Sequence, residues 1–230
     1  MNTKPLFGIV PIAMLFACAA GNEAALADGN TMKWDFQGAS VGKLHGGWTS
    51  DHTGSGKGSV WEVVEDADSP DGSRAIAQVS AEGSGGFFSL CVADNARFED
   101  LVLTISFKAV AGKEDQGGGP VWRYKDANNY YIARMNPLED NFRVYKVENG
   151  KRTELGSADV KAAAGAWHTI RIEHTGDRIQ CSLNGKVYLD VNDATFPGAG
   201  KIGLWTKADA QTRFAAIGVE SEVAQLVFGK

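Results

Sequence analysis

The sequence predicts an all-β protein, an antiparallel β-sandwich, from three observations. Glycine supplies 28 of the 230 residues, well above its usual share of about 7%. Apolar and polar residues alternate in many short runs, a pattern typical of strands that are buried on one face. Asn-Gly pairs, which favour two-residue hairpin turns, separate alternating runs at two places, Asn149-Gly150 and Asn184-Gly185.

The clearest strand covers residues 101–108, where four apolar residues alternate with four others. Its period of two indicates one core face and one semi-polar face. The turn at residues 175–178 joins two further strands, so residues 167–191 are expected to form a three-stranded meander. An alanine-rich stretch at 158–166 is the one candidate for a helical turn. The same alternation predicts strands at 60–65, 75–80, 87–92, 121–125, 130–135, 142–147, 168–174, 179–183, 186–191, 202–205 and 213–219.

The start of the chain has the features of a secretory signal. Lys4 precedes an apolar run over residues 6–20, which is shorter than the ~20 residues of a membrane-spanning helix. Ala25-Leu26-Ala27 then forms an A-x-A cleavage site. Lipid attachment at Cys18, in a sequence similar to the lipoprotein box, is the less favoured alternative.

We therefore expect a signal peptide over residues 1–27, a single β-sandwich domain over 28–230, and a periplasmic or extracellular location. No other stretch is apolar enough to cross a membrane. Cleavage would leave Cys91 and Cys181 as the remaining cysteines. These two cysteines could form a disulfide or remain two unpaired thiols in the core, and the sequence leaves both alternatives open.

Composition excludes one class of partner. The net charge of −5 leaves no basic surplus to neutralise a phosphate backbone, so we expect no nucleic acid. No cofactor is predicted with certainty. A structural calcium ion stays open, with Asp35 and Asp51 as candidate ligands, because oxygen donors from side chains and loops leave no strict sequence signature. The sequence does not indicate the oligomeric state.

The densest chemistry lies in residues 121–136, where aromatic residues alternate with Arg, Asn and Asp. Aromatic rings stack on the C–H face of a sugar, and planar polar groups bind its hydroxyls. Arg123, Arg134 and Asn136 are the best candidate ligand contacts. The structural alternative is that the rings belong to the core and the arginines pair with Glu139 or Asp140.

Sequence signatures of common hydrolases are absent. A glycosidase needs two suitably spaced carboxyl groups, but the adjacent pairs, such as Glu114-Asp115 and Glu139-Asp140, are expected to be solvated turns. The Glu-x-Asp-x-x-Glu strand of jelly-roll endoglucanases and the Gly-x-Ser-x-Gly elbow do not occur.

Three segments, residues 118–134, 136–152 and 196–209, resemble the secreted 3-keto-disaccharide hydrolase domain family. They include Gly-Gly-Pro-Val-Trp-Arg-Tyr-Lys-Asp-Ala-Asn-Asn-Tyr-Tyr-Ile-Ala-Arg and Lys-Ile-Gly-Leu-Trp-Thr-Lys-Ala-Asp. The resemblance covers nearly all of residues 32–220. It implies a concanavalin A-like jelly roll, related in architecture to laminin-G domains and family 16 glycoside hydrolases, with sugar-derived substrates in some members.

From the resemblance and the residues together, the expected function is an exported carbohydrate-active domain that binds a glycoside or 3-keto-glycoside, and its cleavage by a hydrolase or lyase reaction stays open. Glu139 is the candidate general acid or base. The alternative is a non-catalytic lectin-like or protein-interaction module of the cell envelope. The expected substrate-binding residues are Arg123, Tyr131, Arg134, Asn136, Tyr145, Trp205 and Lys207.

One departure from the family weakens the enzymatic expectation. Relatives usually carry two aspartates after an aromatic residue near the end of the domain, whereas here Phe214 is followed by Ala215 and Ala216. If those carboxylates serve a metal or acid–base role in relatives, this chain lacks that role.

Overall fold

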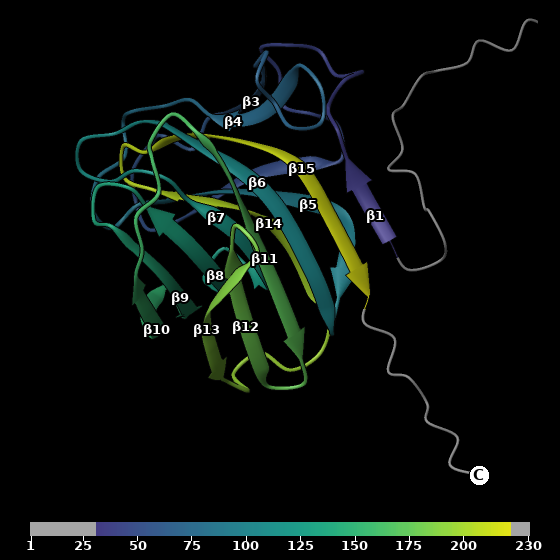
Figure 1. The fold of residues 1–230 in the computed structure, drawn as a ribbon, viewed down its shortest axis with the longest axis vertical. Helices are drawn as coiled ribbons and strands as arrows, with labels where there is room; N and C mark the ends of the chain where they lie inside the picture. Colours follow the sequence, from purple (N-terminus) through teal and green to yellow (C-terminus); the bar gives the residue numbers. More distant parts are fainter. Residues whose placement is uncertain (1–30, 222–230) are drawn as a thin grey trace, which may run out of the picture.

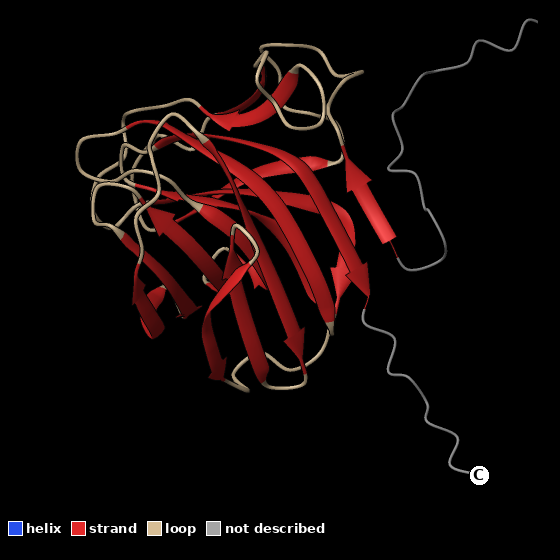
Figure 2. Ribbon diagram, viewed as in Figure 1, coloured by secondary structure: helices blue, strands red, loops and turns tan. Residues whose placement is uncertain are grey.

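A computed structural model describes residues 31–221 of the chain. Within these residues the protein consists of fifteen strands joined by loops, with no helix (Figure 2). The predicted signal peptide over residues 1–27 lies outside the described residues. In the part that the structure describes, no helix is long and apolar enough to span a membrane.

The strands form two antiparallel sheets, named sheet A and sheet B. Sheet A has eight strands, and β1 (Thr31–Trp34) pairs only with β15 at its side. The other strands of sheet A lie in the order β13 (Lys186–Asn192), β12 (Arg178–Leu183), β11 (Trp167–Thr175), β6 (Leu101–Ala111), β15 (Gln211–Ser221), β4 (Arg74–Gln78) and β3 (Trp61–Glu65).

Sheet B has seven strands and carries the residues that the sequence analysis singles out. Their order is β10 (Lys151–Asp159), β9 (Asn141–Glu148), β8 (Asn129–Asn136), β7 (Gly119–Asp126), β14 (Gly200–Lys207), β5 (Phe88–Phe98) and β2 (Trp48–Thr53).

The two sheets pack face to face, as Figure 1 shows, with β6, β11 and β15 toward the viewer and β7 to β10 behind them. Alternate residues of each strand point into the space between the sheets. Leu103 and Ile105 from sheet A meet Trp122 and Val144 from sheet B there, all of them buried. Burial of each such side chain contributes about 1.5–3 kcal/mol. The predicted antiparallel β-sandwich of jelly-roll type is confirmed.

Local predictions are also largely confirmed. All twelve predicted strands lie in or overlap observed strands, and residues 167–191 form the expected meander. Asn149 and Asn184 adopt positive φ, followed by glycines that do the same, as the hairpin turns require. The prediction of a helical turn at 158–166 was wrong, because this stretch continues β10 and then forms a loop.

The cysteines resolve the alternative that the sequence left open. Cys91 lies in sheet B and Cys181 in sheet A; both are buried and neither forms a disulfide. Burial raises the pKa of both thiols above the usual range, so they remain protonated and pack as small apolar groups.

Candidate functional site

The outer face of sheet B is concave. Arg152 on β10 lies over the ring of Phe88 on β5, with 5.1 Å between the guanidinium carbon and the ring centroid. Five strand steps separate these strands, which would place them roughly 24 Å apart in a flat sheet. Thr53 on β2 and Tyr130 on β8 are four steps apart, yet their hydroxyl oxygens lie 2.6 Å apart. The sheet therefore curls into a cup around its outer face.

Aromatic rings fill the floor of this cup. They alternate with core residues along the same strands, because successive side chains of a strand point to opposite faces. Trp205 packs on Phe88 with ring centroids 5.2 Å apart, and Tyr124 stacks on Tyr130 at 6.0 Å. The floor consists of Phe88, Leu90, Val92, Val121, Tyr124, Tyr130, Ile132, Tyr145, Val147 and Trp205.

A buried ion pair stands beside the aromatic floor. Arg134 Nη1 lies 3.1 Å from Asp115 Oδ1, and each side chain is 1% exposed. Lys207 donates to the second carboxylate oxygen, Oδ2, at 2.9 Å, and Asn136 Nδ2 donates to Oδ1 at 3.0 Å. Asp115 thus accepts three hydrogen bonds from side chains, two of them from cations. Such charge-assisted bonds are shorter and stronger than neutral ones.

Glu139 lies at the open side of the cup and is ionised at neutral pH. Arg134 Nη2 donates to Glu139 Oε2 at 2.7 Å and Asn141 Nδ2 donates to the same oxygen at 3.0 Å. Partial burial acts to raise the pKa of Glu139, but these hydrogen bonds and the guanidinium charges outweigh burial and lower the pKa to about 2.

Asp115 has the opposite shift. Burial raises the pKa of Asp115 above its ordinary value, although the charges of Arg134 and Lys207 act against this change. Two carboxyl groups that share Arg134 therefore differ in their affinity for protons, since one is held ionised and the other is shifted toward protonation. Divergent pKa values of this kind occur at functional sites.

Arg143, Glu154 and Arg152 are further charged residues around the floor. Arg143 is 3.5 Å from Glu154 and 3.6 Å from Glu139, measured from guanidinium nitrogen to carboxylate oxygen. The side chains of Arg143, Glu139 and Glu154 are 32–46% exposed. Arg152 instead lies over aromatic rings, 4.5 Å from the centroid of Tyr145 and 5.7 Å from that of Trp205.

Six of the eight predicted site residues meet in this cup. They come from β8, β9 and β14 and from the turn between β8 and β9. The six residues are Arg134, Asn136, Glu139, Tyr145, Trp205 and Lys207.

Arg123 does not join them. It sits at a bulge of β7 with φ of 46°, and its guanidinium donates to the backbone oxygens of Glu99, Phe196 and Gly176 and to Asp100. All three guanidinium nitrogens are used in this way, so Arg123 ties loops to the end of the sandwich.

Tyr131 lies on the opposite face of sheet B, in the core between the sheets. Its ring stacks on Trp122 with centroids 5.7 Å apart, and its hydroxyl donates to Asp193 Oδ1 at 2.6 Å. The strand alternation accounts for this placement, since Tyr130 and Ile132 point into the cup and Tyr131 between them points away.

Sequence reasoning missed the central acid. Asp115 was expected in a solvated turn, and this expectation was wrong because its side chain is 1% exposed and holds Arg134 and Lys207. Its position before the glycines at 117–119 was the available signal: these glycines let β7 approach β8 closely, which brings Asp115 over Arg134.

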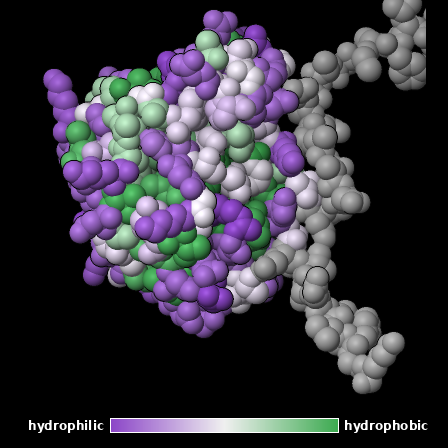
Figure 3. All heavy atoms as spheres, in the orientation of Figure 1, coloured by the Kyte–Doolittle hydropathy of each residue, from purple (hydrophilic) through white to green (hydrophobic). Residues whose placement is uncertain are grey.

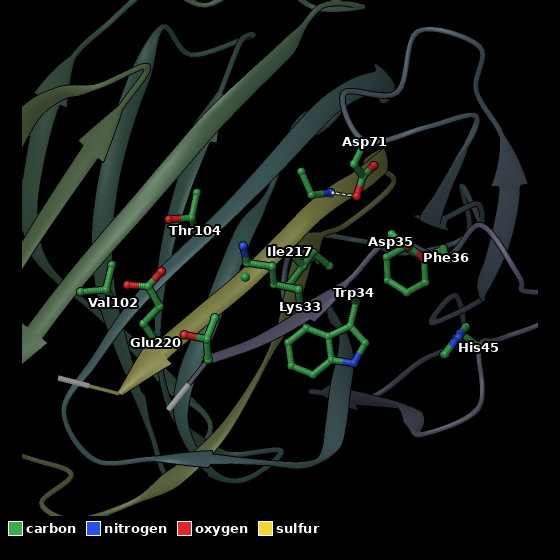
Figure 4. A pocket seen from close by; sticks show the side chains of 13 residues that line it. Lys33, Trp34, Asp35, Phe36, His45, Asp71, Val102, Thr104, Ile217 and Glu220 are labelled. Carbon is green, nitrogen blue, oxygen red and sulfur yellow. Dashed lines mark hydrogen bonds between the residues drawn. The ribbon is translucent and has the colours of Figure 1, made fainter. Parts of the chain in front are cut away.

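A cavity of about 640 Å³ lies on sheet A, away from the cup. It is lined by Lys33 and Trp34 of β1, by the next residue, Asp35, and by Asp71, as Figure 4 shows. Ala216 also lines this cavity and donates its backbone N–H to Asp71 at 2.8 Å. The departure at Ala215-Ala216 is therefore on the sheet opposite the cup.

We place the candidate site in the cup and not in this cavity, because the predicted site residues converge in the cup.

On the face of sheet A that Figure 3 shows, hydrophobic and hydrophilic residues are interspersed and no single apolar area dominates.

No group of three or more His, Cys, Asp or Glu side chains within residues 31–221 is arranged to hold a metal ion. The two aspartates considered for calcium have other contacts. Asp51 accepts a hydrogen bond from the Tyr124 hydroxyl at 2.6 Å, and Asp35 accepts one from the backbone of Gln37 at 3.1 Å.

Comparisons with known proteins place these observations in context. Residues 33–220 match the 3-keto-alpha-glucoside-1,2-lyase-like domain family. A stretch of 80 residues is 28% identical to levanase from Bacillus subtilis (strain 168), covering 35% of this chain and only 12% of the levanase.

Two solved structures share the fold. The carbohydrate-binding module CBM66 from Bacillus subtilis aligns with a TM-score of 0.61 and 22% identity, covering 76% of this chain and 96% of the module. Domain 4 of AbnA, a GH43 extracellular arabinanase from Geobacillus stearothermophilus in complex with arabinotriose, aligns with a TM-score of 0.55 and 11% identity, covering 82% and 90%.

Proposed function

Because the chain belongs to the 3-keto-alpha-glucoside-1,2-lyase-like domain family, we propose that it is an exported carbohydrate-active domain that binds a glycoside in the cup of sheet B. The observation that carries this proposal is the convergence of an aromatic floor with a ring of charged hydrogen-bonding groups on one concave face. Carbohydrate-binding neighbours of the same fold support it.

The chemistry of the cup suits a polyhydroxylated ligand. Arg143, Glu139 and Glu154 reach solvent at its open side and offer both donors and acceptors. Lys207, whose side chain is 16% exposed, offers a further donor above the buried Asp115. Since these groups already hold one another by ion pairs, they are preorganised, which lowers the entropic cost of binding.

Binding ranks above catalysis because of the state of Glu139. A pKa of about 2 keeps this carboxylate ionised but makes it a weak base. Asp115 has a raised pKa, but it is enclosed by its partners Arg134 and Lys207.

Cleavage of a 3-keto-glycoside is the second candidate, favoured by the contrast between Glu139 and Asp115. The 3-keto group acidifies the neighbouring C2–H bond. Glu139 would accept that proton while the C2–H electron pair forms a double bond to C1, the C1–O bond to the leaving group breaks, and the departing oxygen takes a proton from water. Lys207 or Arg143 would stabilise the charge that develops on the keto oxygen.

The test uses the full chain and a panel of glycosides with their 3-keto forms, with binding followed by calorimetry and product release by mass spectrometry. The matched variants are Glu139→Gln and, as a control, Glu99→Gln, an exposed residue in the turn between β5 and β6. Binding of a glycoside without turnover supports the first candidate. Turnover that Glu139→Gln abolishes supports the second.

Failure of every glycoside to bind or react would contradict both candidates. The remaining function would then be the protein-interaction module of the cell envelope that the sequence analysis kept as an alternative.

Export is part of the proposal and rests on residues 1–27. Cleavage after Ala27 gives a mature chain that begins at Asp28. Mass spectrometry of the protein isolated from its producing cell tests this: an N-terminus at Asp28 is expected, and a lipidated Cys18 or an intact Met1 would contradict it.

A further inference from the structure

Arg152 is the one cation of the cup that has no carboxylate partner among the described residues. Arg134 and Lys207 both pair with Asp115, and Arg143 lies near Glu139 and Glu154. Glu154 faces the same side of β10 as Arg152, two residues away, but its carboxylate pairs with Arg143. Asp115, Glu139 and Glu154 are thus already engaged by other cations, and Asp51 accepts a hydrogen bond from the Tyr124 hydroxyl.

The hydrogen-bonding groups of Arg152 are also unused. Its Nη1 is enclosed and has no hydrogen-bond partner within residues 31–221. The residue as a whole is only partly buried. A buried polar group without a partner is destabilising, and more so when it is charged, so stability alone does not explain this residue.

The aromatic rings do not supply the missing partner. The guanidinium carbon lies over three rings, 4.5 Å from the centroid of Tyr145, 5.1 Å from that of Phe88 and 5.7 Å from that of Trp205. Such a cation–π contact is made by the positive charge and gives the N–H groups no carboxylate acceptor. A guanidinium binds a carboxylate through two parallel hydrogen bonds.

We propose that Arg152 binds a carboxylate group of the ligand, so that the cup takes an acidic glycoside, one that contains a uronic acid. This inference rests on the proposed function and narrows its substrate class. A sugar carboxylate would supply the hydrogen-bond acceptors that Arg152 lacks among the described residues. The aromatic floor would exclude water from the ion pair between Arg152 and the sugar. Burial and the neighbouring charge of Arg134 act to lower the pKa of Arg152, and an anion beside it would reverse this effect.

The experiment compares acidic and neutral sugars that differ only at C6. Methyl glycosides of glucuronic and galacturonic acid, in both anomeric forms, are titrated against the full chain beside methyl glucosides and methyl galactosides. We expect at least one acid to bind about tenfold or more tightly than its neutral counterpart, with the difference shrinking as salt is raised.

Arg152→Gln should remove this preference, so that the acidic and the neutral sugar bind the variant with affinities within about twofold of each other. Lys151→Gln is the matched control, since it removes a neighbouring charge from the opposite, exposed face of β10 and should retain the preference. Circular dichroism verifies that each variant is folded.

The outcomes separate this inference from the proposed function. Equal affinity for acidic and neutral sugars in the unmodified chain overturns the role of Arg152 while glycoside binding stands. A preference for acids that survives in Arg152→Gln overturns it as well. Binding of neither class contradicts both proposals. If Arg152→Gln does not fold, the preference of the unmodified chain for acidic over neutral sugars, and the dependence of that preference on salt, still decide whether the cup takes an acidic glycoside.

Discussion

At the scale of single residues, Asp115 shows how far a local pattern can mislead. Its neighbours, Glu114 and Gln116, are polar, and a polar run beside glycines predicts a solvated loop. The partners that bury it, Arg134 and Lys207, lie 19 and 92 residues further along the chain. No local window contains those contacts, so the glycines at 117–119 indicate a close approach of backbones but not the side chains that bury this acid.

Arg134 was easier to predict. It lies in the predicted strand at 130–135, within a nearly continuous run of aromatic and apolar residues that includes Tyr131 and Ile132. A charged residue in such a strand requires a buried partner or a ligand. The structure reveals a partner, Asp115, and leaves ligand contact by Arg134 as a prediction.

Asp115→Asn should destabilise the protein by about 3 kcal/mol, because loss of one partner from a buried ion pair leaves the other charge uncompensated. Both Asp115 and Arg134 are 1% exposed. Urea unfolding at pH 7, monitored by tryptophan fluorescence, measures the change in the free energy of unfolding.

Asp140→Asn is the control for that variant. Asp140 pairs with Lys161 at 3.7 Å, but these side chains are 50% and 89% exposed, and exposed pairs contribute little. Asparagine also tolerates the positive φ of this position. A loss below about 1 kcal/mol for Asp115→Asn, or similar losses for both variants, would contradict the proposed importance of the buried pair.

At the scale of elements, the strands that the sequence analysis missed are all edge strands. β2 and β10 end sheet B, and β1 pairs only with β15. An edge strand buries fewer side chains, so its apolar alternation is weak. In β10 a bulge between Glu154 and Gly156 interrupts the alternation further. Central strands such as β6 and β8 are half or fully buried and gave clear patterns.

The glycine cluster at 117–119 lies where two backbones approach each other closely. A Cβ added to Gly119 would lie 1.9 Å from the carbonyl oxygen of Ala133 on β8. The neighbouring Arg134 follows Ala133 directly, so the spacing of β7 and β8 also sets the position of the charged cluster.

Gly119→Ala should therefore destabilise the protein by about 2–3 kcal/mol, because the backbone of β7 must move away from β8. Thermal unfolding measures this loss, and binding of any identified ligand should weaken with it. Gly46→Ala is the control, since Gly46 lies in a turn with no atom within 4 Å of an added Cβ. A fully stable Gly119→Ala variant would show that the two strands separate without cost.

At the scale of the whole molecule, the sequence predicted the layers but not their pairing. Alternation identifies a buried face of each strand, yet the neighbours of β14 in the sheet, β5 and β7, come from far earlier in the chain. The cup depends on this order, because it places Trp205 beside Leu90 and opposite Gly119. The individual site residues were therefore predictable, whereas their shared concave face was not.

One contact between the sheets makes the stability of the whole sandwich depend on pH. Trp122 from sheet B donates its Nε1–H to Nδ1 of His174 in sheet A at 2.8 Å. His174 is fully buried. Burial, with the nearby positive charge of Arg123, lowers the pKa of His174 from 6.5 to about 4. Protonation of Nδ1 would also remove the acceptor that Trp122 uses.

The sign of the effect follows from linkage. Between pH 6.5 and pH 4 the unfolded chain binds a proton at His174 that the folded chain does not, so stability falls as the pH decreases through this range. A shift of this size corresponds to roughly 3 kcal/mol.

His174→Gln keeps a hydrogen-bond acceptor for Trp122 without a titrating ring, and it should lose this part of the pH dependence. Urea unfolding at pH 7, 6, 5 and 4 measures it, with His52→Gln, at an exposed position of β2, as the control. Identical pH profiles for the unmodified chain and His174→Gln would mean that protonation of the buried imidazole does not contribute to the pH dependence of the free energy of unfolding.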